Sequence, residues 1–159
     1  MVVKSTYAAF DVIGISARTT NKAEFDGKGV IASLWQRFFA EQVYAKVPHR
    51  TDSKIMALYC EYASDKDDAY TIVLGVRVTH VDKIPAGMVV QHVPAQPYAI
   101  FTTQKGQMPG IVVNTWQEIW RQEQATTLKR AYCTDYELYD ERSSDPQNAQ
   151  IDIYIGIKA

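Results

Sequence analysis

The sequence predicts an α+β domain in which one antiparallel sheet carries two helices on a single face. Three observations support this fold class. The chain has 159 residues, 47% of them apolar and 22% charged, which fits one compact domain with its own core. Segments of alternating apolar residues are interleaved with two segments of helical spacing. The order strand, helix, strand, strand occurs twice, so we expect a single domain over residues 1–159, with repeats at about 4–79 and 87–159.

Charge and cysteine content exclude several classes of protein. The formal net charge is -1, whereas nucleic-acid binding calls for a clear basic excess. We therefore expect no direct binding to nucleic acid. Two cysteines, Cys60 and Cys133, make neither a disulfide framework nor a zinc site. No apolar run approaches membrane-spanning length and no secretory start is seen, so we expect a cytoplasmic protein without a membrane span.

The first half shows one helix among three strands. Apolar residues at i, i+3, i+4 and i+7 predict a helix over residues 30–47, which Pro48 ends. Within residues 70–78 the even positions are all apolar and the odd positions are mixed, which favours a strand with one face on a core and the other towards water or a cleft. The expected elements are a strand at 6–18, a loop at 19–29, the helix at 30–47, a strand at 55–63, an acidic loop at 64–68 and a strand at 70–78.

The second half repeats this order after a linking segment at 80–87. Pro94 and Pro97 interrupt the strand composition of residues 88–102, since proline cannot donate to a ladder. Pro109 is acceptable in the first turn of a helix. The expected elements are strand material at 88–102, a turn at 105–110, a helix at 111–126, a strand at 132–139, a polar loop at 141–150 and a strand at 151–158.

A constant spacing of 81 residues aligns the two halves. The spacing relates three pairs of residues, which are Gly29 and Gly110, Trp35 and Trp116, and Gly75 and Gly156. With one residue of slip, Ala57 aligns with Glu137 and Tyr59 aligns with Tyr139. We therefore expect a pseudo-twofold axis, with the second strand of each half lying close to it.

The segment YCTDYELY at residues 132–139 is chemically unusual, because it sets acids among tyrosines. Strand alternation places Asp135, Glu137 and Tyr139 on one face. A carboxylate among aromatic rings is costly to bury unless a cation joins it, and ring faces attract cations. Glu137 is therefore a candidate counter-ion in a pocket for a cationic, partly apolar small molecule, with Tyr59 and Tyr139 as walls. A solvated glutamate on an exposed strand face is the alternative that the residues alone leave open.

The ordered set of these segments resembles the gyrase-inhibitor-like effector-binding domains, which are the ligand-sensing domains of AraC-type and MerR-type multidrug transcription regulators. The segments GIVVNTWQEIW at 110–120, DYELY at 135–139 and IDIYI at 151–155 carry the resemblance. The segment ALYCEYASD at 57–65, followed by Tyr-Thr at 70–71, is most similar to the integron-associated effector-binding proteins, which are stand-alone versions. The similarity covers nearly the whole chain, although each motif is short.

The resemblance implies that cationic, lipophilic compounds bind in an aromatic pocket with a buried glutamate. That glutamate falls on Glu137, the aromatic residue of the second strand on Tyr59, and the helix tryptophan on Trp116. To these ligand-binding candidates we add Trp120, one helical turn further on, and Tyr139. We thus expect a stand-alone effector-binding, drug-sensing protein that is linked to transcription regulation.

Some aromatic residues of the helices are expected in the core instead. Trp35, Phe38 and Phe39 are predicted core residues of the first helix, and a place in the helix–sheet core is also the alternative for Trp116. The sequence departs from full-length regulators because no helix-turn-helix region precedes the first strand. We therefore expect that the chain does not bind an operator by itself. A separate DNA-binding partner and a homodimer are partners that stay open.

Two other classes of function also stay open. A Glu–Tyr pair is able to support hydrolysis of electrophilic small molecules, since an apolar site raises the pKa of a glutamate, and some gyrase-inhibitor-like proteins look like hydrolases. A protein-interaction module acting on gyrase or another partner is the second alternative. The sequence has no nucleophile motif, no Gly-rich phosphate loop and no calcium-ligand spacing. We therefore expect no enzyme, no cofactor and no metal.

Overall fold

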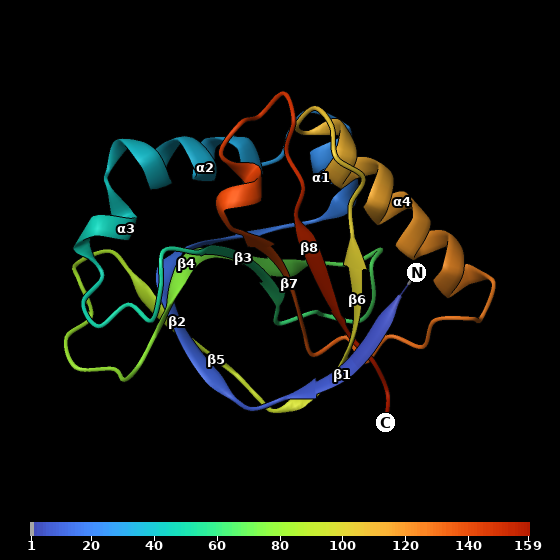
Figure 1. The fold of residues 1–159 in the computed structure, drawn as a ribbon, viewed down its shortest axis with the longest axis horizontal. Coiled ribbons are helices and arrows are strands. Elements are labelled where there is room, and N and C mark those ends of the chain that lie inside the picture. Colours follow the sequence, from blue (N-terminus) through green and yellow to red (C-terminus); the bar gives the residue numbers. More distant parts are fainter. Residues whose placement is uncertain (1) are drawn as a thin grey trace.

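The computed structural model describes residues 2–159 and confirms the α+β fold class. The elements, in chain order, are β1 (Val3–Tyr7), β2 (Phe10–Thr19), α1 (Asn21–Phe25), α2 (Ile31–Ala40), α3 (Val43–Lys46), β3 (Ile55–Cys60), β4 (Tyr70–Val78), β5 (Val89–Val93), β6 (Gln96–Thr102), α4 (Gly110–Gln124), β7 (Thr134–Tyr139), the short 3-10 helix η1 (Glu141–Ser143) and β8 (Asp152–Gly156). The strands form one antiparallel sheet in the order β1-β6-β8-β7-β3-β4-β2-β5. Figure 1 shows the helices gathered on one side of this sheet.

The sheet curls because its two edges belong to one continuous ribbon. Residues 3–7 pair with 96–100, and residues 10–14 pair with 89–93 in the same register. Pro94 stands opposite Ala9 in this register and has no N–H to donate, so the pairing breaks there. The predicted single strand over residues 6–18 is therefore wrong, since β1 pairs with the second half and β2 with the first. Figure 1 shows this ribbon sweeping below the rest of the sheet.

The predicted helix over residues 30–47 is two helices, because the chain turns at Gln42. That residue has a left-handed backbone with φ of 52°, and α3 follows it. On one straight helix Val43 would lie about 180° around the axis from Leu34, at 100° per residue. The turn directs Val43 and Val47 into the same core as Leu34, where all three are buried. Burial of these two valines is the physical reason for the break.

The predicted loop over residues 19–29 contains a helix, α1. Thr20 caps its N-terminus, since its hydroxyl accepts a hydrogen bond from the Ala23 backbone N–H at 3.0 Å. Glu24 on α1 in turn caps α2. Its carboxylate accepts from the backbone N–H groups of Val30, at 2.9 Å, and Ile31, at 3.3 Å. The polar composition that suggested a loop therefore serves two helix N-termini.

Two predicted strands are shorter than expected at one end. The strand predicted at 55–63 ends at Cys60, because Glu61 has a φ of 50°. The strand predicted at 132–139 begins at Thr134, because Tyr132 has a φ of 55°. Left-handed residues cannot continue a ladder. The strand at 70–78 and the helix after the turn at 105–110 are confirmed.

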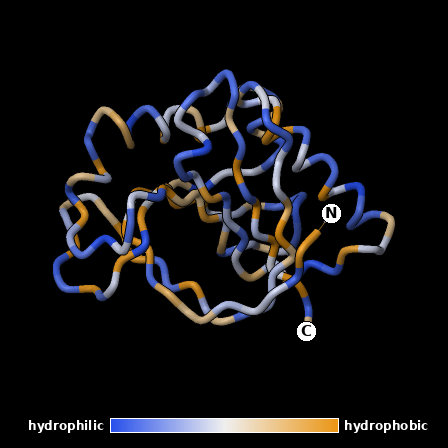
Figure 2. The backbone as a smooth tube through the Cα atoms, in the orientation of Figure 1, coloured by the Kyte–Doolittle hydropathy of each residue, from blue (hydrophilic) through white to orange (hydrophobic). Residues whose placement is uncertain are grey.

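Both faces of the sheet are packed, contrary to the expectation of a face towards water or a cleft at β4. On the helix side, α2 and α3 cover the first half and α4 covers the second. The curled sheet encloses a third core on its other face, which includes Val73 of β4. The members of this inner core are Phe10, Val12, Met56, Leu58, Cys60, Val73, Val93, Tyr98 and Tyr136. Figure 2 shows the apolar segments concentrated in the strands and the hydrophilic ones in the outer loops.

The two halves meet at the centre of the sheet, where β3 pairs with β7. Ala57 lies directly opposite Glu137 in this pair. The same two residues are equivalent positions of the sequence repeat, so the pseudo-twofold axis passes between them. Glu137 and Tyr139 face the helices, and Tyr139 packs against both helix-side cores. The fold thus places one carboxylate on the axis that relates its halves.

A buried ion pair anchors the beginning of β7. Arg130, which is 4% exposed, donates from Nη2 to Asp135 Oδ2 at 2.7 Å, and Asp135 is fully buried. The hydroxyl of Tyr62 donates to the same oxygen at 2.5 Å, and the Gly156 N–H donates to Oδ1 at 2.7 Å. Asp135 therefore joins the loop after β3, the loop before β7 and β8. This anchoring holds the strand that carries Glu137.

We expect Asp135→Asn to lower the free energy of unfolding by roughly 3–5 kcal/mol, because Arg130 would keep a buried charge without its close partner. Chemical denaturation at neutral pH measures this loss. Asp67→Asn in an exposed loop is the matched control, with an expected change below about 1 kcal/mol. Equal changes in the two variants would contradict the anchoring role.

Candidate functional site

The candidate site is built around the carboxylate of Glu137, which three neutral side chains hold. Oε2 accepts from the Tyr59 hydroxyl at 2.9 Å and from Trp116 Nε1–H at 2.7 Å. Oε1 accepts from the Tyr139 hydroxyl at 2.5 Å. These donors come from β3, α4 and β7, so the network ties both halves and one helix to a single charge. The three bonds solvate the carboxylate without neutralising it.

Burial changes the proton affinity of this group. Glu137 is only 3% exposed, and this burial raises its pKa above the ordinary value of a glutamate. The hydrogen bonds from Tyr139, Trp116 and Tyr59 act in the opposite direction, because they favour the charged form. Burial and the neighbouring carboxylate raise the pKa of both tyrosine hydroxyls well above their usual value. The tyrosines therefore remain protonated donors.

A cavity of about 300 Å³ lies between α1 and α4 on one side of Glu137. We call it the α4 cavity. Its walls are mainly aromatic, with Tyr59 and Trp116 beside the carboxylate. The rings of Trp116 and Trp120 lie 6.2 Å apart, and Phe25 of α1 meets Trp120 edge-on at 5.9 Å. The lining residues are Asn21, Glu24, Phe25, Ile31, Tyr59, Tyr62, Lys66, Tyr70, Val112, Val113, Trp116, Trp120, Arg130 and Glu137.

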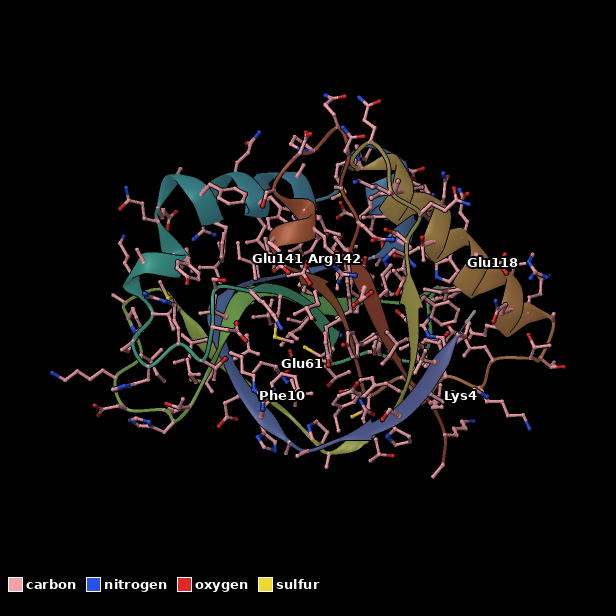
Figure 3. All side chains as sticks on the ribbon, in the orientation of Figure 1. Lys4, Phe10, Glu61, Glu118, Glu141 and Arg142 are labelled. Carbon is pink, nitrogen blue, oxygen red and sulfur yellow. The ribbon has the colours of Figure 1, made fainter. Side chains whose placement is uncertain are left out.

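A second cavity, of about 900 Å³, lies under α2 and η1 on the other side of Glu137. We call it the α2 cavity. Trp35 and Tyr139 form its aromatic wall, with their rings edge-on at 5.1 Å. Figure 3 shows Glu141 and Arg142 between α2 and α4, where η1 follows β7. The lining residues are Glu24, Ile31, Ala32, Trp35, Phe39, Ser53, Ile55, Tyr59, Met108, Pro109, Val112, Glu137, Tyr139, Asp140, Glu141, Ser143, Ser144 and Pro146.

The structure brings the five predicted site residues together, but around two cavities. Tyr59 and Glu137 line both of them, Trp116 and Trp120 line the α4 cavity, and Tyr139 lines the α2 cavity. The alternative of an exposed, solvated glutamate is wrong for Glu137, because the carboxyl is buried and hydrogen-bonded.

The predicted core residues of the first helix have three different surroundings. Phe38 is buried at 1% exposure, which confirms its place in the core. Phe39 is 62% exposed, so its core assignment is wrong. Trp35 packs against the first core but also lines the α2 cavity. Phe39 belongs to the rim of that cavity, since it stacks on Trp35 at 5.9 Å.

Sequence reasoning missed Glu24 and Phe25, because they lie on α1 within the predicted loop. Glu24 lines both cavities and Phe25 lines the α4 cavity. The usable signal was Thr20 followed by an acidic residue in the next turn, a pattern typical of a helix start. Within residues 2–159 no cluster of three or more His, Cys, Asp or Glu side chains is arranged to hold a metal ion.

The sequence matches a known family along most of its length. The family model described as the integron-associated effector binding protein matches residues 6–157. The chain belongs to this family. Its resemblance to the integron-associated effector-binding proteins is thereby confirmed. Among residues 2–159 no helix has the length and apolar character needed to cross a membrane.

Two curated relatives of this family member are named as transcriptional regulators. YobU of Bacillus subtilis is 33% identical over 146 residues, which are 91% of this chain and 90% of YobU. BrlR of Pseudomonas aeruginosa is 32% identical over 155 residues, which are 94% of this chain but 52% of BrlR. The chain thus spans about half the length of BrlR. These names describe regulation rather than catalysis.

Solved structures share the same fold. An integron cassette protein from the mobile metagenome of Vibrio cholerae aligns with 99% of this chain and 95% of its own, at 29% identity and a TM-score of 0.78. A second protein, solved with bound tetraphenylphosphonium, aligns with 100% of this chain and 94% of its own, at 20% identity and a TM-score of 0.79. The doubled architecture is therefore common to all three proteins.

We expect the raised pKa of Glu137 to make wild-type stability fall with rising pH, relative to Glu137→Gln. The folded state binds the proton of Glu137 more tightly than the unfolded state does. Protonation therefore adds to the free energy of unfolding, and this contribution is fully present below about pH 4.3, the pKa of a glutamate in the unfolded chain. It is lost as the pH rises through the raised folded pKa. Denaturant unfolding of both proteins across this range measures the difference.

Glu118→Gln on the outer side of α4 is the control for that experiment (Figure 3). Arg121 lowers the pKa of Glu118, so any contribution from this exposed group has the opposite sign. Parallel pH profiles for wild type and Glu137→Gln would show that the folded state does not perturb Glu137.

Proposed function

We propose that this protein binds cationic, lipophilic small molecules beside Glu137 and acts as a drug sensor linked to transcription regulation. The observation that carries the proposal is the carboxylate of Glu137, which is buried among aromatic rings and held only by neutral donors. A buried carboxylate is costly without a positive partner. A cationic ligand supplies that partner where little water competes.

The hydrogen-bond network favours cations that need no N–H group. The two oxygens of Glu137 already accept three hydrogen bonds from Tyr59, Trp116 and Tyr139. A phosphonium or quaternary ammonium ion offers charge without donors, so it attracts the carboxylate and leaves this network intact. Each favourable ring contact adds about 0.5–2 kcal/mol through cation–π attraction. Rings and one charge recognise a class of compounds, so selectivity should be loose.

Similar proteins of known structure or name support both a cationic ligand and a role in transcription regulation. A protein of the same fold has been solved with tetraphenylphosphonium, and two relatives are named as transcriptional regulators. BrlR is about twice as long as the matched region. We propose that ligand binding here is communicated to a separate DNA-binding partner, with residues Tyr59, Trp116, Trp120, Glu137 and Tyr139 as the ligand contacts.

The hydrolase alternative has weaker support. A general base must direct a free oxygen lone pair at water. Tyr59 and Trp116 occupy Oε2 of Glu137 and Tyr139 occupies one site on Oε1, so three of about four acceptor sites are already used. Burial raises the pKa of the two tyrosine hydroxyls, which makes them poor nucleophiles near neutral pH. The arrangement is better suited to holding a charge than to transferring a proton.

We expect Glu137→Gln to remove the preference for cations while binding of neutral aromatic compounds persists. Tryptophan fluorescence titration with tetraphenylphosphonium, beside neutral triphenylphosphine oxide, measures both affinities. The cation should lose about tenfold or more in affinity, since opposite charges about 4–6 Å apart attract each other by about 3–4 kcal/mol at an effective dielectric constant of about 20. Glu118→Gln, on the outer side of α4, is the matched control and should bind both compounds as wild type does.

Three outcomes would count against the proposed site. Equal loss of cation and neutral compound in Glu137→Gln would mean that the residue supports the fold. Turnover of a bound compound would favour the hydrolase. No binding of either compound, with the fold intact by circular dichroism, would favour the protein-interaction module.

We also expect cation affinity to rise with pH through the raised pKa of Glu137. Only the ionised carboxylate attracts the ligand, so affinity should change by about tenfold per pH unit well below that pKa and level off above it. Calorimetric titration of tetraphenylphosphonium at a series of pH values measures this slope. The Glu137→Gln variant should show a flat profile, and a slope retained in that variant would assign the titration to another group.

A further inference from the structure

The two cavities beside Glu137 are related by the same pseudo-twofold axis as the two halves of the fold. Trp116 lines the α4 cavity, and Trp35, its mate 81 residues earlier, lines the α2 cavity. Two further pairs of lining residues stand 80 positions apart, Tyr59 with Tyr139 and Lys66 with Pro146. Part of the lining of one cavity is therefore repeated in the other.

Three of the residues common to both cavities have the same symmetry. Ile31 and Val112 line both cavities and are repeat mates 81 positions apart. Glu137 also lines both, and it lies on the axis opposite Ala57. Its Oε2 is held by Tyr59 and Trp116, whereas its Oε1 is held by Tyr139. One carboxylate thus stands between two aromatic cavities.

We propose that the α2 cavity is a second cation-binding pocket that shares the charge of Glu137 with the α4 cavity and takes the larger aromatic cations. This inference rests on the proposed function, because it assigns a second place to the same class of ligand. Trp35, Tyr139 and Phe39 are its aromatic contacts. This assignment also explains why Phe39, a large apolar side chain, is exposed, since its ring extends the wall formed by Trp35.

Size and charge distinguish the two pockets. The α2 cavity has about 900 Å³ against about 300 Å³ for the α4 cavity, so bulky ring systems have more room in the first. Lys66 and Arg130 lie among the lining residues of the α4 cavity. The described lining of the α2 cavity contains no lysine, arginine or histidine but does contain Asp140 and Glu141. Asp140 is itself paired with Arg142 at 2.9 Å, so the difference in charge between the two cavities rests on the cationic side chains, which line only the α4 cavity of the two.

The shared carboxylate should make occupation of the two pockets mutually exclusive for singly charged ligands. A cation in one pocket neutralises Glu137 and places a positive charge near the other pocket. Glu24 also lines both cavities, but it accepts hydrogen bonds from Thr19 and from the N-terminus of α2. Its charge is thus already balanced by the helix end. Ligands bound at different places should therefore compete.

Two matched tryptophan variants test the assignment. Of the two cavities, Trp35→Leu alters only the α2 cavity and Trp120→Leu alters only the α4 cavity, and neither side chain is bonded to Glu137. Calorimetric titration would use a large rhodamine-type cation and the small benzyltrimethylammonium ion. We expect Trp35→Leu to weaken the large cation by about tenfold more than the small one, and Trp120→Leu to do the reverse. Benzyltrimethylammonium at saturation should also weaken binding of the dye.

The results separate this inference from the proposed function. If neither cation binds the wild type, the proposed function fails. If both cations bind but the two variants shift the ratio of large-cation to small-cation affinity in the same direction, the proposal of a second pocket is wrong while cation binding stands. A dye affinity that saturating benzyltrimethylammonium leaves unchanged would overturn the shared charge. Should Trp35→Leu not fold, Phe39→Ala replaces it, since that exposed residue lines only the α2 cavity.

Discussion

The organisation of this protein depends on one negative charge placed at the axis of a duplicated fold. Glu137 and Ala57 face each other across the central strand pair. Side chains opposite each other in antiparallel strands are about 4.5–5.5 Å apart at Cβ, so two carboxylates there would repel each other in a buried place. One half of the duplication therefore carries the charge and the other carries a methyl group. This difference gives a nearly symmetric scaffold a single electrostatic centre.

The surrounding donors connect that centre to the rest of the fold. Tyr59 reaches it from β3, Tyr139 from β7 and Trp116 from α4. These side chains both solvate the charge and form the walls on either side of it. The same residues therefore satisfy the buried carboxylate and also contact a ligand in the proposed complex. A preformed site of this kind needs little rearrangement before it binds a cation.

How much was predictable depends on whether a feature is local. The face of Glu137 follows from strand alternation, and the two halves follow from residues spaced at a fixed interval. The break at Gln42 left a detectable signal, since Val43 and Val47 fall on the wrong side of a straight helix, but burial decided it. Helix α1 and the exposure of Phe39 could not be predicted from periodicity. Thr20 and Glu24 are polar in a loop and in a cap alike, and Phe39 is exposed because it lies at the α2 cavity, where it stacks on Trp35.

By itself, the sequence determined the doubled strand-helix-strand-strand plan, the aromatic surroundings of one acid, and the family to which the chain belongs. These depend on backbone periods and residue identities, which neighbouring positions specify. Only the tertiary structure decided that Ala57 stands opposite Glu137 and that two cavities flank one carboxylate. It also decided that β1 of the first half pairs with β6 of the second, and that β5 of the second half pairs with β2 of the first. Those features depend on the register between strands about 80 residues apart, which is set when cores pack on both faces of the curled sheet.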